Sequence, residues 1–161
     1  MIIGIDPGLN GAIAMFDEHT GKILNIIDMP VESKATKGNR IDARELLQII
    51  DMIRTHAETF GIATGVVIEM VNAMPKQGVT SSFNFGEGYG VLRCAVSTTD
   101  WPIVYVSPNK WKKALGLTGK DKSYSITKAK ELMPDAAQFL TLKKHDGRAE
   151  AALIAYWYGA K

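Results

Sequence analysis

The chain is poor in cysteine and has no long apolar run. One of its 161 residues, Cys94, is cysteine, so a disulfide within the chain is excluded and a reducing compartment is expected. No apolar run reaches the roughly 18 residues of a membrane span, and the amino terminus lacks the basic segment and cleavage site of a signal peptide. The sequence therefore predicts a protein of the cytoplasm with no membrane segment, and it predicts Cys94 in the core.

Net charge is also small, at +2, so the overall charge does not point to a nucleic-acid partner. Basic residues are nevertheless concentrated in the C-terminal third of the chain. That segment contains Lys110, Lys112, Lys113, Lys120, Lys122, Lys128, Lys130, Lys143, Lys144 and Arg148. A local basic surface of this kind is expected to follow phosphates, and a solvated helix face is the alternative.

Length and composition predict one domain over residues 1–161, with an ordinary apolar content of 46%. Hydrophobic periodicity and turn residues predict the elements. Strands are expected at 1–6, 12–16, 23–29, 64–69 and 102–106, helices at 42–61, 82–97, 107–115, 122–133 and 146–159, and a loop at 30–41. This order predicts an α/β fold in which a mixed five-stranded sheet, its first three strands antiparallel, has helices on both faces.

Two of the predicted strands end in an acid. The first delivers Asp6 into a Pro-Gly turn, and the fourth ends at Glu69. A carboxylate at the end of an apolar strand is costly unless it binds a metal or a proton. If the first and fourth strands pair, Asp6 and Glu69 become neighbours. The alternatives are that Asp6 only forms the turn and that Glu69 is a satisfied edge carboxylate.

A third acidic pair opens the last predicted helix. Asp146 and Glu150 are four residues apart and so share a helix face. Together with Asp6 and Glu69 they would form a cluster of oxygen ligands, which favours Mg²⁺, with Mn²⁺ as a substitute, and has room for two ions. Helix capping by Asp146 is the alternative, and His145 is either a ligand or an ordinary loop histidine.

Several segments in order resemble the RuvC-type Holliday-junction resolvases, which have a ribonuclease H-like fold. The resemblance is nearest to the phage and plastid branches and runs from residue 1 to about 158. It is carried by Ile3-Gly4-Ile5-Asp6-Pro7-Gly8, Val67-Ile68-Glu69, Phe85-Gly86-Glu87-Gly88-Tyr89-Gly90, Ser107-Pro108-Asn109-Lys110-Trp111-Lys112-Lys113, Gly119-Lys120-Asp121-Lys122 and His145-Asp146-Gly147-Arg148-Ala149-Glu150-Ala151.

The resemblance implies a homodimeric, metal-dependent endonuclease of DNA recombination and repair that nicks four-way junctions symmetrically. It implies that Asp6, Glu69 and Glu150 are catalytic metal ligands and that Lys112 and Lys122 are the family's two functional lysines. Asp146 and His145 compete to complete the metal site, because the spacing before Glu150 differs by one residue from that of the bacterial enzymes. A phage origin is compatible with this branch.

The resemblance also suggests DNA contacts. Lys110, Lys113, Lys120 and Arg148 are expected to join the two functional lysines on the DNA. Where the bacterial enzymes carry an aromatic wedge, three residues after the second acid, this chain has Asn72. Met74 or Phe83 is expected to enter the junction centre instead. The helix containing Gly86 and Gly90 is expected to contact a second copy of the chain.

Three other functions remain open on the sequence. The same carboxylates would serve a ribonuclease H-like nuclease acting on branched DNA, flaps or RNA-processing intermediates. A non-catalytic junction binder with vestigial acids is the second. The third is an ATP-binding protein of the sugar-kinase or actin type, because the Gly4–Gly8 turn also suits a phosphate loop. That class needs two such domains, and the chain is long enough for only one.

Overall fold

A mixed five-stranded sheet lies at the centre of the computed structural model, which describes residues 1–34, 38–72 and 78–160. The strand order is β3-β2-β1-β6-β7, and β1 is antiparallel to β2 and parallel to β6. The strands are β1 (Ile2–Asp6), β2 (Ala12–Asp17), β3 (Lys22–Asp28), β6 (Gly65–Glu69) and β7 (Ile103–Val106). The predicted sheet, its antiparallel start and the pairing of its first and fourth strands are confirmed.

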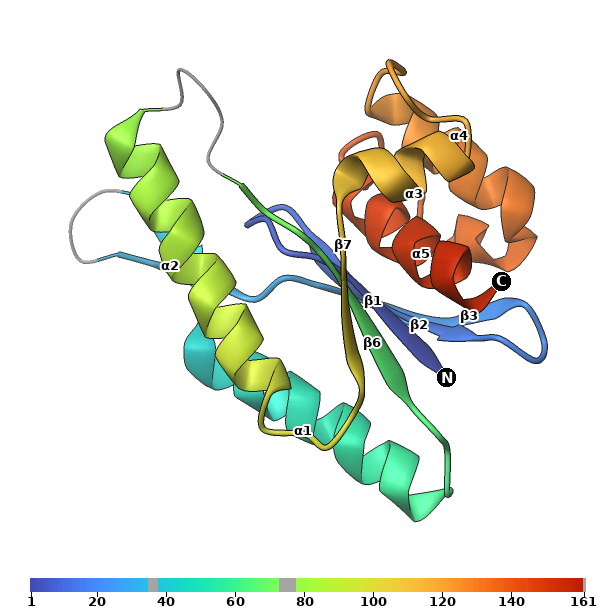
Figure 1. Ribbon diagram of the computed structural model, residues 1–161, viewed down its shortest axis with the longest axis horizontal. Coiled ribbons are helices and arrows are strands. Elements are labelled where there is room, and N and C mark those ends of the chain that lie inside the picture. Colours follow the sequence, from blue (N-terminus) through green and yellow to red (C-terminus); the bar gives the residue numbers. More distant parts are fainter. Residues whose placement is uncertain (35–37, 73–77, 161) are drawn as a thin grey trace.

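Helices cover both faces of this sheet, as predicted (Figure 1). The helices α1 (Ala43–Thr59) and α2 (Val79–Val96) pack on one face. The other face carries α3 (Pro108–Ala114), α4 (Ser123–Leu132), the 3-10 helix η1 (Pro134–Gln138) and α5 (Asp146–Gly159). None of the helices in the described ranges is both long and apolar enough to cross a bilayer.

Strand alternation decides which side chains face α5. In β1, Ile3 and Ile5 belong to the apolar cluster under α1 and α2, whereas Ile2 belongs to the cluster under α5. Successive side chains point to opposite faces, so Asp6 lies on the α5 side. In β6, Val67 belongs to the α5 cluster, and two residues later Glu69 therefore faces the same way.

Helix α5 lies directly against β1, and two glycines permit this contact. A Cβ on Gly4 would lie 2.3 Å from the carbonyl oxygen of Ala151, and one on Gly147 would lie 1.9 Å from that of Asn10. Both distances are far below van der Waals contact, so only glycine fits at either position. These contacts fix the first turns of α5 over the end of β1, which is where the acids gather.

The prediction of a loop over residues 30–41 is wrong. A two-stranded sheet forms there from β4 (Val31–Ser33) and β5 (Asn39–Ile41). Each strand has three residues, too few for an alternating pattern to be recognisable. The buried Ile41 side chain anchors this hairpin against Gly88 of α2.

The expectations for α2 need a second correction. The helix begins at Val79, slightly before the predicted start, and Cys94 on it is exposed rather than in the core. Of its three glycines, Gly88 is the one that lies close to another part of the described chain, since a Cβ there would be 3.2 Å from Ile41 Cδ1, whereas one on Gly86 or Gly90 would meet nothing within 4 Å. The face of α2 that carries Gly86 and Gly90 therefore has open space beside it.

Candidate active site

The ends of β1 and β6 bring the first two predicted acids together. Ile5 is paired with Ile68 in the parallel register, and Asp6 and Glu69 each follow directly. The Gly8 N–H donates to Asp6 Oδ1 at 3.5 Å within the turn. The turn-forming interpretation of Asp6 therefore describes one of its contacts, but its side chain also faces the two other acids described next.

Helix α5 adds Glu150 as the third acid. Its side chain is buried, and its neighbours along the helix are small alanines. It accepts a hydrogen bond from Lys112 Nζ at 3.0 Å and one from Ser125 Oγ at 3.2 Å. Burying a carboxylate is unfavourable unless it is paired, and here a lysine of α3 and a hydroxyl of α4 supply the partners.

Burial and mutual repulsion perturb two of these acids. The pKa of Asp6 rises from 3.8 to about 7, chiefly because the carboxyl is buried and then because of the negative charges of Glu150 and Glu69. The pKa of Glu69 is also raised by burial, against the opposing effects of the Trp111 hydrogen bond and of Lys112. Two partly buried acids whose pKa values are raised in this way, beside a third carboxylate, are typical of a functional site.

Asp146 lies at the first residue of α5, one turn before Glu150. Its carboxylate is 3.9 Å from Lys122 Nζ, and the side chain of that lysine is 82% exposed. The structure gives Asp146 no cap hydrogen bond of the kind expected for a helix-capping role, since His145 is the N-cap residue. Asp146 therefore borders the three-acid cluster on its solvent side, with one of the predicted functional lysines beside it.

His145 is directed away from the acids. The Leu142 N–H donates to its Nδ1 at 3.4 Å, and its charged neighbours are Arg148, Asp28 and Lys144. Burial, followed by the positive charge of Arg148, lowers the pKa of this imidazole. The contacts of His145 are thus those of a residue that holds the loop before α5.

Arg148, predicted to contact DNA, is engaged within the protein. Its guanidinium donates to both carboxylate oxygens of Asp28, at 2.5 and 2.6 Å, and to the Phe139 carbonyl oxygen at 3.1 Å. Such a bidentate pair is among the stronger side-chain interactions. It ties the first turn of α5 to the end of β3.

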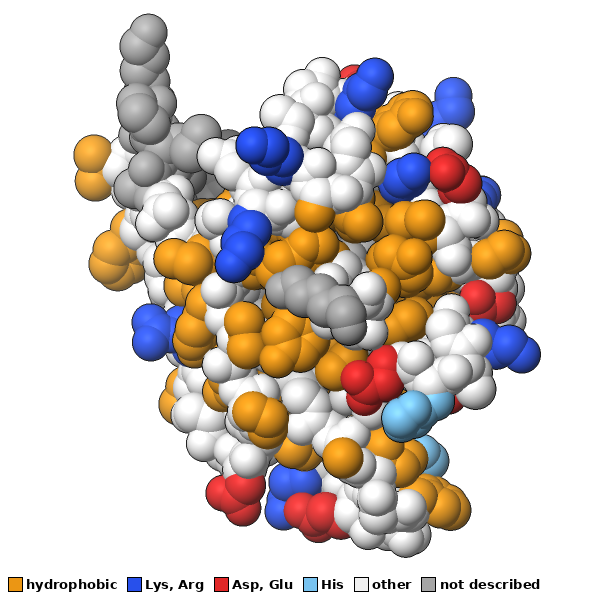
Figure 2. Space-filling model, turned by 45° about the vertical axis from the view of Figure 1, so that its right-hand side comes forward, with side chains coloured by type: hydrophobic (Ala, Val, Ile, Leu, Met, Phe, Trp, Pro, Cys, Tyr) orange, Lys and Arg blue, Asp and Glu red, His pale blue; other side chains and the backbone are white. Residues whose placement is uncertain are grey.

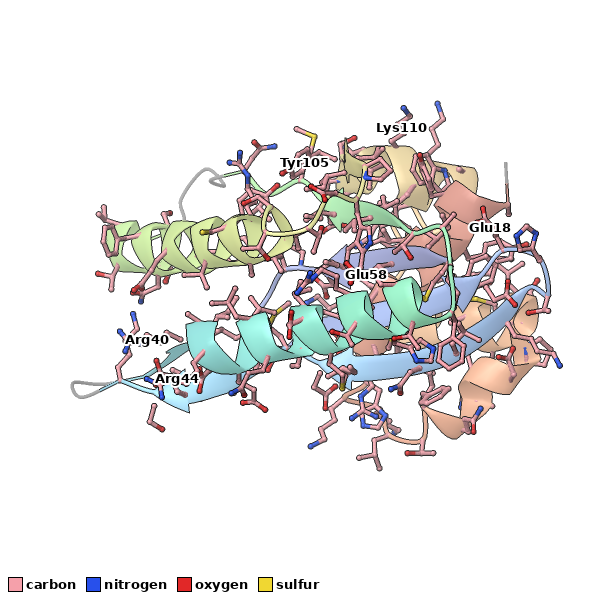
Figure 3. The ribbon with its side chains drawn as sticks, turned by 90° about the horizontal axis from the view of Figure 1, so that it is seen from below. Glu18, Arg40, Arg44, Glu58, Tyr105 and Lys110 are labelled. Carbon is pink, nitrogen blue, oxygen red and sulfur yellow. The ribbon has the colours of Figure 1, made fainter. Side chains whose placement is uncertain are left out.

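Three of the predicted basic residues lie beside the acids. Lys112, Lys120, Lys122 and Glu150 line a pocket of about 40 Å³, enough for a water molecule or a single ligand oxygen. Lys110 is exposed and projects from the end of the molecule that carries α3 (Figure 3). Lysine and arginine side chains gather over the upper part of the space-filling view, the end where α3 and α4 lie (Figure 2).

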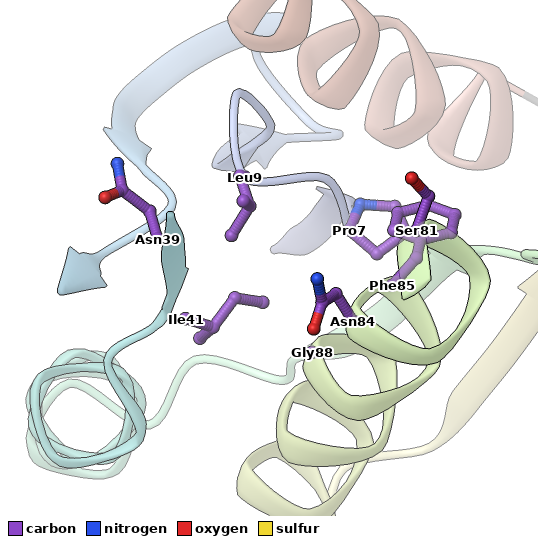
Figure 4. A pocket seen from close by; sticks show the side chains of 8 residues that line it. All are labelled: Pro7, Leu9, Asn39, Ile41, Ser81, Asn84, Phe85 and Gly88. Carbon is purple, nitrogen blue, oxygen red and sulfur yellow. The ribbon is translucent and has the colours of Figure 1, made fainter. Parts of the chain in front are cut away.

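A larger hollow of about 380 Å³ opens beside the acids but contains none of them (Figure 4). It lies between the turn after β1, the β5 strand and α2. Its lining consists of Pro7, Leu9, Asn39, Ile41, Ser81, Asn84, Phe85 and Gly88. Because no ionisable side chain lines it, this hollow lacks groups for acid–base or metal chemistry.

The structure describes one of the two predicted wedge residues. Phe83 is 72% exposed on α2, in a position to meet another molecule. Met74 lies outside the described residues.

Sequence reasoning missed Trp111 and Ser125 as partners of the acids. The fully buried Trp111 indole donates from Nε1 to Glu69 Oε2 at 2.6 Å. A buried tryptophan N–H requires an acceptor, and this requirement was the available signal. Ser125 gave none, because an isolated serine within a helix is common.

As the side chains stand, the described residues contain no group of three His, Cys, Asp or Glu side chains arranged to hold a metal ion. The hydrogen bonds explain this, since Glu150 is turned to Lys112 and Ser125 while Glu69 is turned to Trp111. The three acids are thus near one another but partnered by protein donors.

Comparison with known proteins gives consistent relatives. A family model described as "Crossover junction endodeoxyribonuclease RuvC" matches residues 2–145. The chloroplastic Holliday junction resolvase MOC1 of Chlamydomonas reinhardtii is 28% identical over 150 residues. That alignment covers 81% of this chain and 17% of the relative, so the chain spans about a sixth of that protein's length.

Solved structures show the same fold. RuvC of T. thermophilus in complex with a Holliday junction substrate has a TM-score of 0.55 at 16% identity, over 97% of this chain and 90% of that one. A second Thermus thermophilus RuvC structure has a TM-score of 0.51 at 18% identity, over 97% and 91% of the two chains. The expected ribonuclease H-like fold is confirmed. With the family model matching most of its length, the chain belongs to the RuvC family, whose members are metal-dependent crossover junction endodeoxyribonucleases.

Proposed function

We propose that this chain is a structure-selective endonuclease that resolves four-way DNA junctions by symmetric phosphodiester nicking. One observation carries the proposal. Asp6, Glu69 and Glu150 come from the ends of two strands and from α5, and they lie close enough that Glu150 raises the pKa of both Asp6 and Glu69. Membership of the RuvC family supplies the reaction class. Residues 1–161 would act as one nuclease domain. We propose that it acts in the cytoplasm, as the sequence predicts.

The donor set suits a divalent cation of the Mg²⁺ type. All the donors are carboxylate oxygens, which Mg²⁺ and Mn²⁺ prefer. Like charges that raise the pKa of Asp6 are relieved when a cation binds between them. We assign Asp6, Glu69 and Glu150 as the ligands, with Asp146 as a fourth, and two ions per site. His145 is left out of this assignment because its ring contacts the loop before α5.

When bound, such ions lower the pKa of a water nucleophile and neutralise charge on the leaving oxygen. The protein's own part is positioning. Asp6 and Glu69 are fixed by paired strands, and Glu150 by the helix locked onto β1. The Lys112 ammonium, which donates to Glu150 Oε1 at 3.0 Å, would offset developing charge on a phosphate bound beside the acids.

The remaining lysines would hold the DNA backbone. Lys120 and Lys122 line the small pocket beside Glu150, and Lys110 and Lys113 are exposed on α3. Contacts to phosphates position DNA without reading its sequence, so we propose recognition of the junction mainly by its shape. Phe83, exposed on α2, would lie against unpaired bases near the junction centre.

We propose that two copies associate through α2. Val79, Gly86 and Gly90 are spaced seven and four residues apart and so form one helix face. Val79 is 87% exposed, and the two glycines leave open space. A two-fold dimer would present two sites to the two-fold axis of a junction, as paired nicks require.

The substrate is tested with a panel of end-labelled nucleic acids in Mg²⁺. The panel contains an immobile four-way junction, linear duplex, a flap and an RNA–DNA hybrid of matched sequence. The proposal expects paired nicks at symmetric positions in the junction alone. Equal cutting of the flap or the hybrid would replace the proposal with a broader branched-nucleic-acid nuclease. Binding without cutting at any metal concentration would favour a non-catalytic junction binder.

A further inference from the structure

Glu69 is held by a hydrogen bond that its place in the sheet does not require. The Trp111 Nε1–H donates to Glu69 Oε2 at 2.6 Å, and the indole ring is fully buried in the apolar cluster below α5. A carboxylate can accept about four hydrogen bonds, two at each oxygen. The indole therefore orients the carboxyl group while leaving its second oxygen, Oε1, available.

The backbone holds Glu69 and Trp111 in fixed positions beside each other. Glu69 is paired with Val106 in the parallel register of β6 and β7. The chain then turns at Ser107 into α3, where Pro108 sets the first helical position and Trp111 follows in the first turn. Packing on all sides fixes the ring, so its N–H has one direction.

We infer that Trp111 is a positioning residue for the metal site, fixing the orientation in which the Glu69 carboxylate would bind a divalent cation. The inference rests on the proposed metal-dependent activity. Hydrogen bonds from protein groups to a metal ligand commonly set the ligand's orientation and strength, and their loss costs about 10-fold to 100-fold in metal affinity or activity. Trp111 is fully buried and so has no surface for DNA, which separates its effect from junction binding.

The hydrogen bond and its link to metal are read from indole N–H resonances of ¹⁵N-labelled protein. The three tryptophans give three such signals. Glu69→Ala should move the Trp111 signal, which is assigned by elimination with Trp101→Phe and Trp157→Phe, and leave that of Trp101 in place. Trp101 precedes β7 at the end of the strand remote from Glu69, so it is the matched control. Substoichiometric Mn²⁺ should broaden Trp111 before Trp101.

The second readout is the metal dependence of cleavage and of calorimetric Mg²⁺ binding. Trp111→Phe keeps an aromatic ring but removes the donor. We expect about 10-fold to 100-fold weaker metal binding, unchanged junction affinity, and cleavage that recovers at high Mg²⁺ concentration. Trp101→Phe should behave as the unmodified protein in all three measurements. Recovery at high metal is the signature of ligand positioning, because structural damage to the core would not be reversed by Mg²⁺.

Three results would overturn the inference. They are a Trp111 signal indifferent to Glu69→Ala and to Mn²⁺, wild-type metal affinity in Trp111→Phe, and a loss of cleavage that no Mg²⁺ concentration restores. The Glu69→Ala spectrum decides the matter even if Trp111→Phe does not fold. Failure of the proposed function looks different, since the Trp111 signal would then respond to Mn²⁺ while unmodified protein left junctions uncut.

Discussion

The Lys112 ammonium on α3 lies 3.0 Å from Glu150 Oε1 on α5, so a lysine stands among the carboxylates of the candidate active site. Ser125 Oγ donates to the same oxygen at 3.2 Å. Lys112 also opposes the rise in pKa of Asp6 and of Glu69. A single ammonium thus supplies positive charge to all three acids in the metal-free protein.

Lys112→Met should therefore slow junction cleavage by about 10²–10³-fold, since it removes a cation placed to offset charge in the transition state. It should also lower the free energy of unfolding without metal by about 1–3 kcal/mol, because Glu150 loses a partner. Mg²⁺ should then raise the thermal midpoint more in the variant than in unmodified protein. Cleavage assays and thermal unfolding with and without Mg²⁺ measure both effects.

Lys130→Met is the matched control, because this substitution removes the same charge from an exposed position on α4. It should change neither cleavage nor the Mg²⁺-induced rise in midpoint by a comparable amount. If Lys112→Met and Lys130→Met behave alike, Lys112 has no particular part in the site.

Asp6→Asn should stabilise the metal-free protein at high pH. The folded-state pKa of Asp6 is raised from 3.8 to about 7, so between these values the folded state binds the additional proton. Stability from this group is present at low pH and is lost as pH rises through about 7. At 1.36 kcal/mol per pKa unit, the variant should gain at most about 4 kcal/mol at pH 8 and close to nothing near pH 4.

Urea unfolding of both proteins at a series of pH values in EDTA measures this difference. The difference between the two proteins isolates Asp6 from the other acids, which titrate in both. A stability difference that stays constant from about pH 4 to 8 would show that Asp6 is not the perturbed group.

Gly147→Ala should displace the start of α5. Its Cβ would lie 1.9 Å from the Asn10 carbonyl oxygen, so the helix or the turn after β1 must move. Overpacking of this kind costs about 1–3 kcal/mol, and cleavage should fall as well because Asp146 and Glu150 sit on the displaced turns. Gly86→Ala meets nothing within 4 Å and should instead gain up to about 1 kcal/mol. Thermal unfolding of the two variants measures this difference. Similar midpoint temperatures for Gly147→Ala and Gly86→Ala would contradict the close contact between Gly147 and Asn10.

Gly90→Leu should weaken association of two copies. Gly90 faces open space in one chain, so a leucine there is tolerated by the monomer but blocks close approach of a second α2. Gln48→Leu, on an exposed position of α1, controls for added apolar surface. Sedimentation at several concentrations should show at least a tenfold weaker dimer for Gly90→Leu, equivalent to about 1.4 kcal/mol. An unchanged dimer would place the interface elsewhere.

The part of the site that follows from strand rules was predictable. Asp6 and Glu69 end apolar strands, and the β1–β6 pairing places them together with the same facing. The start of α1 also follows a local rule, since Asp42 accepts from the N–H groups of Arg44 and Glu45. In each case a local pattern marks the residue: an apolar strand that ends in an acid, or an aspartate before a helix.

What was not predictable depends on tertiary contacts. Lys112 and Arg148 both read as basic residues for DNA, yet one pairs with Glu150 and the other with Asp28, 120 residues away in the chain. The contact of Trp111 is long-range as well, because a buried indole N–H requires an acceptor but the sequence does not show that this acceptor is Glu69. Long-range side-chain pairing leaves no periodic signal.

The most direct test of the account compares unmodified protein with Asp6→Asn on an end-labelled, immobile four-way junction in Mg²⁺. Loss of one charged ligand should abolish cleavage while binding in Ca²⁺ or EDTA, which depends on the lysines, persists. The account predicts symmetric paired nicks by the unmodified protein and none by the variant at equal junction occupancy. Retained cutting by Asp6→Asn would contradict it, because Asp6 would then not belong to the active site.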